Sequence, residues 1–157
     1  MNEQNINKVL LICSEFPPGP GGIGNHAWNL AKNLNNIVPI DVLTISDYVG
    51  IKECKSFDQK EKFNIFRFKR FSTSIITYIH RIFHIIKYVR QRQYSHCILS
   101  GFFSLTMCPI IHLINKKIIK TGVLHGSELV QSNILFKFII IKSLRCLDKI
   151  ISVSHYT

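Results

Sequence analysis

The order of apolar and amphipathic segments constrains the fold of this chain more than any other feature. Short runs rich in Val, Ile and Leu alternate with longer segments whose apolar residues recur at helical spacing. Such alternation is typical of parallel strands joined by crossover helices. We therefore predict one α/β domain over residues 1–157, with a doubly wound, mostly parallel sheet of about six or seven strands and helices on both faces.

The apolar runs give the expected boundaries of the elements. The expected strands cover residues 9–13, 40–45, 64–68, 97–100, 118–124 and 149–153. Helical spacing predicts helices over residues 23–34, 75–89, 104–115 with a kink near Pro109, and 133–146. In sheets of this kind, ligands bind beyond the carboxyl ends of the strands. The loops that follow the strands are therefore where we expect a functional site.

One such loop has an unusual composition. The segment EFPPGPGGIGNHAWNLAKNL, residues 15–34, follows the first expected strand and places three prolines and four glycines before or at the start of an amphipathic helix. Glycine lets the backbone approach a bound group closely, and a helix N-terminus carries partial positive charge. This combination favours an anionic or polyhydroxyl ligand.

A dinucleotide fingerprint is one interpretation of this loop. Gly22, Gly24 and Ala27 match the permissive GxGxxA form, and Asp47 lies about where a ribose-binding acid is expected. In that fingerprint, however, the first glycine follows the strand almost directly. Here SEFPPGPG intervenes, and its prolines predict an extended, wider loop. Because Asp47 can equally end a strand, the context argues against a dinucleotide site.

Charge and cysteine content exclude some classes of function. The 20 lysines and arginines against 9 acids give a net charge of +11, which favours phosphates, anionic lipid or nucleic acid as partners. No RRM, KH or helix-turn-helix pattern supports nucleic-acid binding.

The five cysteines include no CxxC pair, so we expect reduced, buried thiols and no zinc site. The polar start and the short apolar runs predict a cytoplasmic protein without signal peptide or transmembrane helix.

Three segments, in order, carry a resemblance to a known family. Residues 15–34 join PPxxGG to a helix containing LAxxL. Residues 124–128, LHGSE, place His-Gly at a strand end with an acid nearby, and residues 151–157, ISVSHYT, contain a VSxxT turn. Together these motifs resemble the family 4 glycosyltransferases, the group 1 enzymes of the GT-B fold, and they span nearly the whole chain.

The resemblance implies a Rossmann-like fold and a retaining transfer of a sugar from a nucleotide-diphospho sugar to an acceptor, without a cofactor or a tightly bound metal. Such enzymes react in the cleft between two Rossmann-like halves. This chain resembles the N-terminal, acceptor-binding half only, so we expect it to be inactive alone and to need a separate donor-binding half. Glu53 and Glu61 have the spacing of the family's E-x7-E motif but lie in a polar stretch, so we interpret the spacing as coincidence.

The resemblance also suggests roles for residues near the strand ends. Backbone amides of Gly21 and Gly22 would approach the diphosphate or the transferring sugar. His125 would be the catalytic residue, with an imidazole nitrogen bonded to a sugar hydroxyl. The remaining candidates would contact the acceptor: His26, Glu128 and Ser154. Each position has a structural alternative, as a turn glycine, a loop histidine or a helix cap. We expect the glycine turn and His125 to meet at one rim of the sheet.

The helix expected over residues 75–89 belongs to a basic segment. Nine lysines and arginines face one acid between Lys60 and Arg92. An apolar stripe is expected to pack on the sheet: Ile75, Ile79, Ile82, Ile86 and Val89. The opposite face is expected to be solvated: Thr77, His80, Arg81, His84 and Tyr88. Because a basic amphipathic helix can bind anionic lipid, five residues are candidates for a membrane-facing set: Arg81, His84, Lys87, Arg90 and Arg92.

Two classes of function therefore stay open, with a dinucleotide-binding domain as a third and weaker alternative. The first is half of a glycosyltransferase whose acceptor is lipid-linked or a polysaccharide, in the cytoplasm or peripherally on the inner face of the membrane. The second is a non-catalytic basic module that binds anionic membrane or polyphosphate. The sequence identifies neither the sugar, the nucleotide nor the acceptor.

Overall fold

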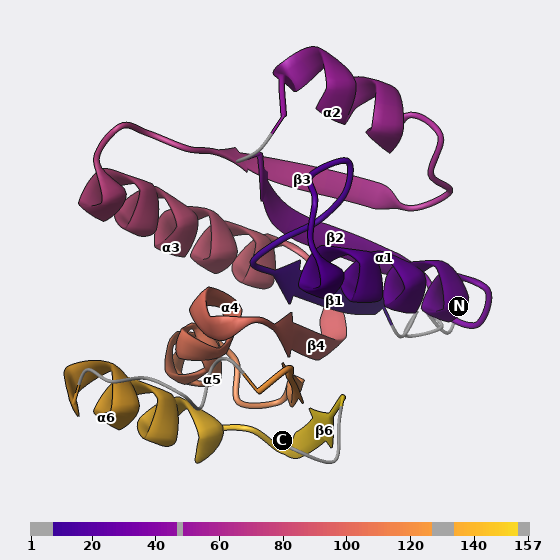
Figure 1. Ribbon diagram of the computed structural model, residues 1–157. Coiled ribbons are helices and arrows are strands. Elements are labelled where there is room, and N and C mark those ends of the chain that lie inside the picture. The colour runs from indigo at the N-terminus through magenta and orange to yellow at the C-terminus, as the bar shows by residue number, and fades with distance from the viewer. Residues whose placement is uncertain (1–7, 47–48, 127–133, 154–157) are drawn as a thin grey trace.

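The computed structural model of the chain describes residues 8–46, 49–126 and 134–153. In this part, six strands form one parallel sheet in the order β3-β2-β1-β4-β5-β6 (Figure 1). The strands are β1 (Lys8–Cys13), β2 (Ile40–Ser46), β3 (Asn64–Lys69), β4 (Tyr94–Ser100), β5 (Ile119–Leu124) and β6 (Lys149–Ser152). The expected doubly wound sheet is confirmed, and its strand order reverses between β1 and β4, where such folds bind ligands.

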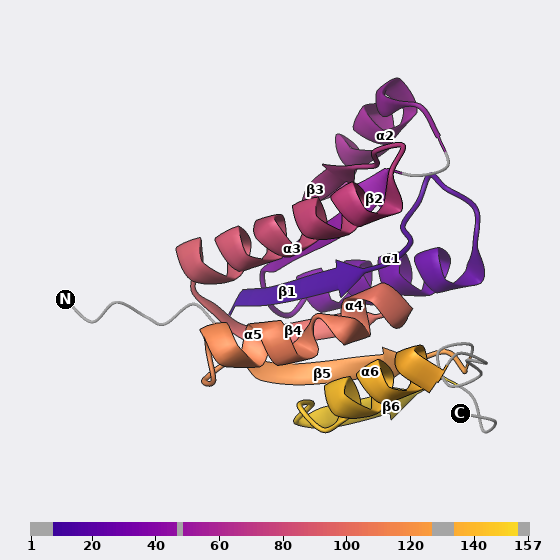
Figure 2. The same ribbon diagram turned by 90° about the vertical axis from the view of Figure 1, so that its left-hand side faces the viewer.

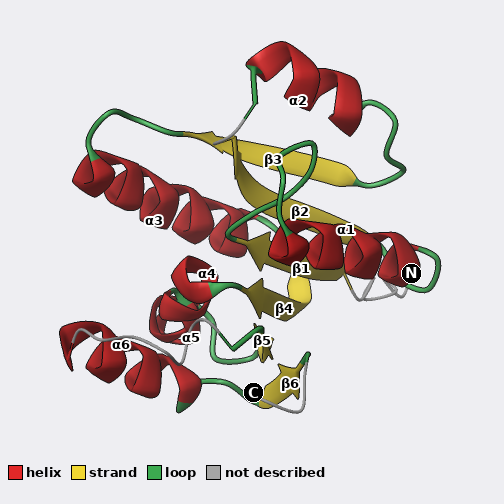
Figure 3. Cartoon of the chain, viewed as in Figure 1, coloured by secondary structure: helices red, strands yellow, loops and turns green. Residues whose placement is uncertain are grey.

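Helices connect the strands (Figure 3). They are α1 (Gly22–Asn35), α2 (Ile51–Asp58), α3 (Ser74–Gln91), α4 (Phe102–Thr106), α5 (Cys108–Ile114) and α6 (Ile134–Leu144). Helices α3 to α6 cover one face of the sheet, and α1 lies on the other (Figures 1 and 2). Within the described residues, no helix is long and apolar enough to cross a bilayer.

The central strand β1 shows why the sheet is covered on both faces. Its residues from Val9 onward are buried, as expected for a parallel strand between two helical layers. Leu11 belongs to the core cluster under α1, whereas Ile12 belongs to the cluster under the opposite helices. Ala27 and Ala31 of α1 are fully buried, because their small side chains let the helix approach the sheet closely.

Two helical predictions need correction. Helix α2 was not expected, because its sequence is polar and buries only Cys54 among its residues. The single kinked helix expected over residues 104–115 is two helices, α4 and α5, separated at Met107. Pro109 lies in the first turn of α5, where its missing N–H and fixed φ are tolerated, so the chain breaks just before it.

Helix α3 packs on the sheet only in part through the face that we expected. Ile75 and Ile79 are 69% and 60% exposed, whereas Thr77 is only 7% exposed. The Thr77 hydroxyl oxygen accepts a hydrogen bond from the Phe71 N–H at 2.9 Å, so its burial leaves no unpaired oxygen. Tyr88 is half-buried against Phe66 of β3, with ring centroids 4.7 Å apart. Val89 is buried and Ile82 packs against the core cluster, as expected. The prediction was therefore wrong only for the amino-terminal part of the helix, because both of its sides carry residues that can pack.

An ionic cluster links the amino ends of four strands. Asp41 of β2 is fully buried, and its carboxylate oxygens accept hydrogen bonds from four side chains. The donors are Asn64 at 2.9 Å, Arg92 at 2.9 Å, Tyr94 at 2.7 Å and Lys8 at 2.8 Å. Burial would raise the pKa of Asp41, but the contacts with Lys8, Tyr94 and Asn64 outweigh burial and hold the pKa below its usual value.

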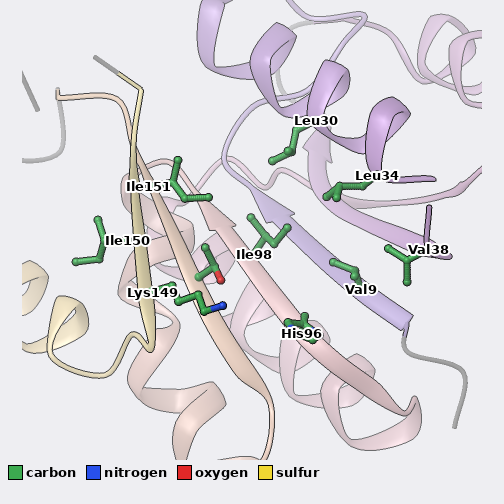
Figure 4. A pocket seen from close by; sticks show the side chains of 10 residues that line it. Val9, Leu30, Leu34, Val38, His96, Ile98, Lys149, Ile150 and Ile151 are labelled. Carbon is green, nitrogen blue, oxygen red and sulfur yellow. The ribbon is translucent and has the colours of Figure 1, made fainter. Parts of the chain in front are cut away.

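Within the described residues, one part of the sheet has no helix over it. The face of β4, β5 and β6 beside α1 forms an apolar groove of about 750 Å³ (Figure 4). Its lining residues are Val9, Leu30, Leu34, Val38, His96, Ile98, Thr121, Lys149, Ile150 and Ile151. The groove follows the face of the sheet, so it is distinct from the loops at the carboxyl ends of the strands.

Candidate functional site

The site forms where the strand order reverses. The ends of β1 and β4 are joined by a hydrogen bond from the Ser14 N–H to the Ser100 carbonyl, 3.1 Å long. The next residue, Gly101, has φ +85°, and a Cβ there would lie 2.7 Å from the Ser14 hydroxyl oxygen. Any other residue would be strained at this positive φ, and its Cβ would clash with Ser14. Glycine at position 101 therefore lets the two loops stay in contact.

A partly buried ion pair positions the loop after β1. The guanidinium of Arg67 on β3 donates to Asp58 at the end of α2, with N–O distances of 2.8 to 3.1 Å. The same guanidinium donates to the Pro17 carbonyl. Phe16 packs edge-to-face on Phe57, with ring centroids 6.3 Å apart. The loop is thus attached to α2 and β3 by both polar and aromatic contacts.

The N-terminus of α1 faces this loop. Gly21, the residue before the helix, has φ +133°, and a Cβ there would lie 2.5 Å from the Glu15 carboxylate. Gly22, by contrast, has open space around the position of a Cβ. The first turn of α1 has neither an acidic residue nor a side-chain cap. Its free N–H groups beside the Glu15 carboxylate combine donors with an acceptor, a combination that suits sugar hydroxyls or a sugar phosphate.

Two histidines from distant parts of the chain meet beside this helix end. His26, in the second turn of α1, contacts His125, the residue after β5, with ring centroids 5.2 Å apart and planes at 84°. Nε2 of His125 lies 3.0 Å from the hydroxyl oxygen of Ser100, which is fully buried. Since one nitrogen of His125 is held by Ser100, the orientation of its ring is fixed.

The structure brings together four of the residues suggested by sequence, namely Gly21, Gly22, His26 and His125. The other two, Glu128 and Ser154, lie outside the described residues, as does Asp47. Sequence reasoning missed Ser100 and Arg67. A polar residue ending a buried strand is the one signal that points to Ser100, whereas nothing local in the sequence distinguishes Arg67.

The five residues of the candidate membrane-facing set have different surroundings. Lys87 and Arg90 are exposed. Arg81 lies over the ring of Phe103, 4.6 Å from its centroid, and His84 packs edge-to-face on Phe68. Arg92 donates to the buried Asp41 carboxylate.

The thiols do not contribute to the site. All five cysteines are free, and four of them are buried. Cys13 ends β1 directly beneath the loop, and burial raises the pKa of its thiol to about 12, so it stays protonated and unreactive at neutral pH. Among the described residues, no group of three or more His, Cys, Asp and Glu side chains is arranged to hold a metal ion.

Comparisons with protein families and with curated proteins find no match to this chain. Solved structures do share its fold. LpCGTa in complex with UDP matches 95% of this chain, with a TM-score of 0.60 and 15% identity. MurG from Acinetobacter baumannii matches 96%, with a TM-score of 0.62 and 12% identity. UGT2 from Phytolacca americana, complexed with UDP-2fluoro-glucose and pterostilbene, matches 79%, with a TM-score of 0.50 and 11% identity.

The fold is that of one half of a GT-B glycosyltransferase. The three matches concern the fold alone, because the sequence identities are 11% to 15%. This chain covers 46%, 43% and 32% of the three matching chains, so it spans less than half of each.

Proposed function

We propose that this chain is the acceptor-side half of a family 4 type glycosyltransferase, which transfers a sugar from a nucleotide-diphospho sugar with retention of configuration. The observation that carries the proposal is the contact of His26 with His125 beside the open N-terminus of α1. In a doubly wound sheet, the carboxyl edge at the reversal of strand order is where ligands bind. The GT-B-like fold supports the same assignment.

Each residue then has a role in the transfer. Amides of Gly21 and Gly22 face the diphosphate, where negative charge grows as the sugar leaves, so they stabilise the transition state more than the ground state. His125, oriented by Ser100, accepts or donates a hydrogen bond at a sugar hydroxyl. We assign acceptor contacts to His26, Glu128 and Ser154. No cofactor or tightly bound metal takes part in this scheme.

The proposal includes a second polypeptide segment that binds the nucleotide. We expect the 157-residue chain alone to release no UDP from UDP-glucose or UDP-N-acetylglucosamine. Coexpression with a GT-B donor-binding half that carries an E-x7-E motif should restore turnover. Turnover by the isolated chain would contradict the half-enzyme assignment.

The role of His125 is testable in the reconstituted enzyme. We expect His125→Ala to lower kcat by about 10²-fold or more, because an interaction that strengthens in the transition state is lost. His112→Ala, a change of a half-buried histidine on α5, should leave kcat unchanged. Equal kcat for the wild-type enzyme and His125→Ala would contradict the catalytic role.

A second candidate function, binding to an anionic membrane, is supported by an exposed apolar surface on α3 and α6. Its residues are Ile75, Ile76, Ile79, Phe83, Ile134, Leu135, Phe136, Phe138 and Ile141, each 43% to 84% exposed. The two helices lie in one layer (Figure 2). Aromatic contacts through α4 connect them, with Tyr78 on Phe103 at 5.2 Å and Phe102 on Phe136 at 5.7 Å.

The charges around this surface suit an anionic lipid headgroup layer. Lys87, Arg90, Lys137 and Lys142 are exposed on the same two helices. Apolar side chains that enter the interface and lysines that meet lipid phosphates would act together. This arrangement differs from the expected one, in which the apolar stripe was internal and only the charges met lipid.

Flotation with phosphatidylglycerol vesicles tests the membrane candidate. We expect Ile79→Glu with Phe138→Glu to reduce the bound fraction at least tenfold, whereas Ile37→Glu, at an 83% exposed position just after α1, should not. Binding that is unaffected by the double change, or by replacing the anionic lipid, would contradict a membrane role for this surface.

A further inference from the structure

Two histidines that the proposed transfer does not use form a close pair on α3. His80 and His84 are one helical turn apart, and their Nε2 atoms are 3.1 Å apart. Their ring centroids are separated by 4.3 Å, with the planes tilted by 53°. The pair therefore presents two nitrogens to nearly the same point in space.

Contacts with the segment around the end of β3 fix the orientation of both rings. Phe71 packs edge-to-face on His80 at 5.0 Å, and Phe68 packs in the same way on His84 at 5.6 Å. Thr77 holds Phe71 in place, because the Phe71 N–H donates to the Thr77 hydroxyl. The rings are thus pre-organised by the fold, unlike a pair of histidines on a free helix.

The nitrogens that meet are suitable ligand atoms. The two Nε2 atoms are within hydrogen-bond distance of each other, so an ion that binds both replaces this hydrogen bond. Nδ1 of His80 is buried and has no hydrogen-bond partner in the described part of the chain. A neutral imidazole with a free lone pair is the form that binds metal.

We propose that His80 and His84 bind one late first-row divalent ion, Cu²⁺, Ni²⁺ or Zn²⁺, through their two Nε2 atoms. Metal–nitrogen bonds of about 2.0 to 2.1 Å place two ligand nitrogens ~2.9 Å apart at a right angle and ~3.4 Å apart at the tetrahedral angle. The observed 3.1 Å lies between these values, so the ion enters with little rearrangement. The site is independent of the proposed sugar transfer.

The chemistry of the pair also limits which ions bind and how tightly. Imidazole ligands favour Zn²⁺, Ni²⁺ and Cu²⁺, whereas Mg²⁺ and Ca²⁺ prefer oxygen. Because the described residues provide no third ligand in such a cluster, water completes the coordination. The affinity is therefore lower than that of a structural zinc site with four protein ligands.

Thermal unfolding of the untagged chain with NiCl₂ or ZnCl₂ tests the proposal, with MgCl₂ for comparison. At a metal concentration tenfold above the dissociation constant, the expected rise in Tm is about 4 °C. Mg²⁺ should produce no rise. His80→Asn and His84→Asn should each abolish the rise. His112→Asn is the matched control, because His112 is also half-buried, with a buried Nδ1 that lacks a partner, and it should retain the rise.

A spectroscopic measurement on the unaltered chain keeps the test independent of how the variants fold. Electron paramagnetic resonance of bound Cu²⁺ should show coupling to two nitrogen nuclei, with one Cu²⁺ per chain. Coupling to a different number of nitrogens, no binding at about 1 mM metal, or a Tm rise that His80→Asn retains would overturn the proposal. Loss of the rise in His125→Asn alone would overturn it too, because the ion would then lie between His26 and His125.

Discussion

At the scale of single residues, Asp41 shows how strongly the fold depends on a few polar groups. Its carboxylate is fully buried, yet donors from the start of β1, from β3 and from the region of β4 all converge on it. Removing the charge of a buried carboxylate leaves such donors without their partner, which is the costly case for a buried ion pair. The cluster therefore stabilises the sheet at its amino end, away from the candidate site.

This arrangement predicts a pH-dependent effect of Asp41→Asn. At pH 7 the variant should be less stable by about 3 kcal/mol. Because the pKa of Asp41 is lowered on folding, its contribution is complete above the unfolded pKa of about 3.9 and is lost as the pH falls through the folded value. Urea unfolding at several pH values should show the difference shrink below about pH 4. A difference that stays constant down to about pH 2 would contradict the assignment.

At the scale of secondary-structure elements, the loop after β1 is held in place by elements that follow it in sequence. Arg67 of β3 and Asp58 of α2 fix the Pro17 carbonyl, while Phe16 packs on Phe57. Since this loop leads directly into α1, the same contacts set the position of the helix N-terminus. The site is thus supported by two elements that do not themselves line it.

Arg67→Ala should therefore loosen the loop and α1's first turn. We expect hydrogen exchange of the amides of residues 15–24 to increase at least tenfold, with a loss of about 2 kcal/mol in global stability because a charged hydrogen-bonded group is removed. Arg90→Ala, an exposed change on α3, is the control and should alter neither quantity. Unchanged exchange in residues 15–24 would show that Arg67 does not position the loop.

The elements also show what could be predicted from sequence. The alternation of apolar runs predicted the strands and a mostly parallel sheet, because the strands differ in length and periodicity from the helices beside them. It did not predict the order of the strands. The inward face of α3 could not be predicted, since Ile79 and Ile85 make equally good apolar faces, and the contacts of Thr77 and the histidine rings decide between them. Likewise, the glycine turn and His125 have local signals, whereas Ser100 and Arg67 act through partners distant in sequence.

At the scale of the whole molecule, the two faces of the sheet are unequally covered. Helices α3 to α6 form a continuous layer on one face, whereas the groove beside α1 leaves β4 to β6 open in the described part of the chain (Figures 2 and 4). Parallel sheets normally have both faces covered. Neighbouring residues of β4 therefore lie in different surroundings, with Leu99 fully buried and Ile98 only half-buried in the groove wall.

These two positions give a matched pair for measuring the asymmetry. We expect Leu99→Ala to reduce the free energy of unfolding by about 3 kcal/mol, because it opens a cavity in a packed core. Ile98→Ala should cost only about 1 kcal/mol, since its side chain already meets solvent. Urea denaturation of both variants would measure the difference, and equal costs would contradict the open face.

The central claim is that the N-terminus of α1 and His125 form one sugar-binding rim. Titration of the ¹⁵N-labelled chain with glucose 1-phosphate and N-acetylglucosamine 1-phosphate, followed by NMR, tests it most directly, because these ligands carry the sugar and phosphate without the nucleotide that the other half binds. Two matched variants place an aspartate at a helix N-terminus where a Cβ has open space: Gly22→Asp on α1 and Gly50→Asp on α2. Both should fold, since a carboxylate there favours a helix.

We predict saturable chemical-shift changes at Gly21, Gly22, His26 and His125 in the unaltered chain and in Gly50→Asp, and none in Gly22→Asp. Shifts confined to other residues, or equal in all three proteins, would contradict the account.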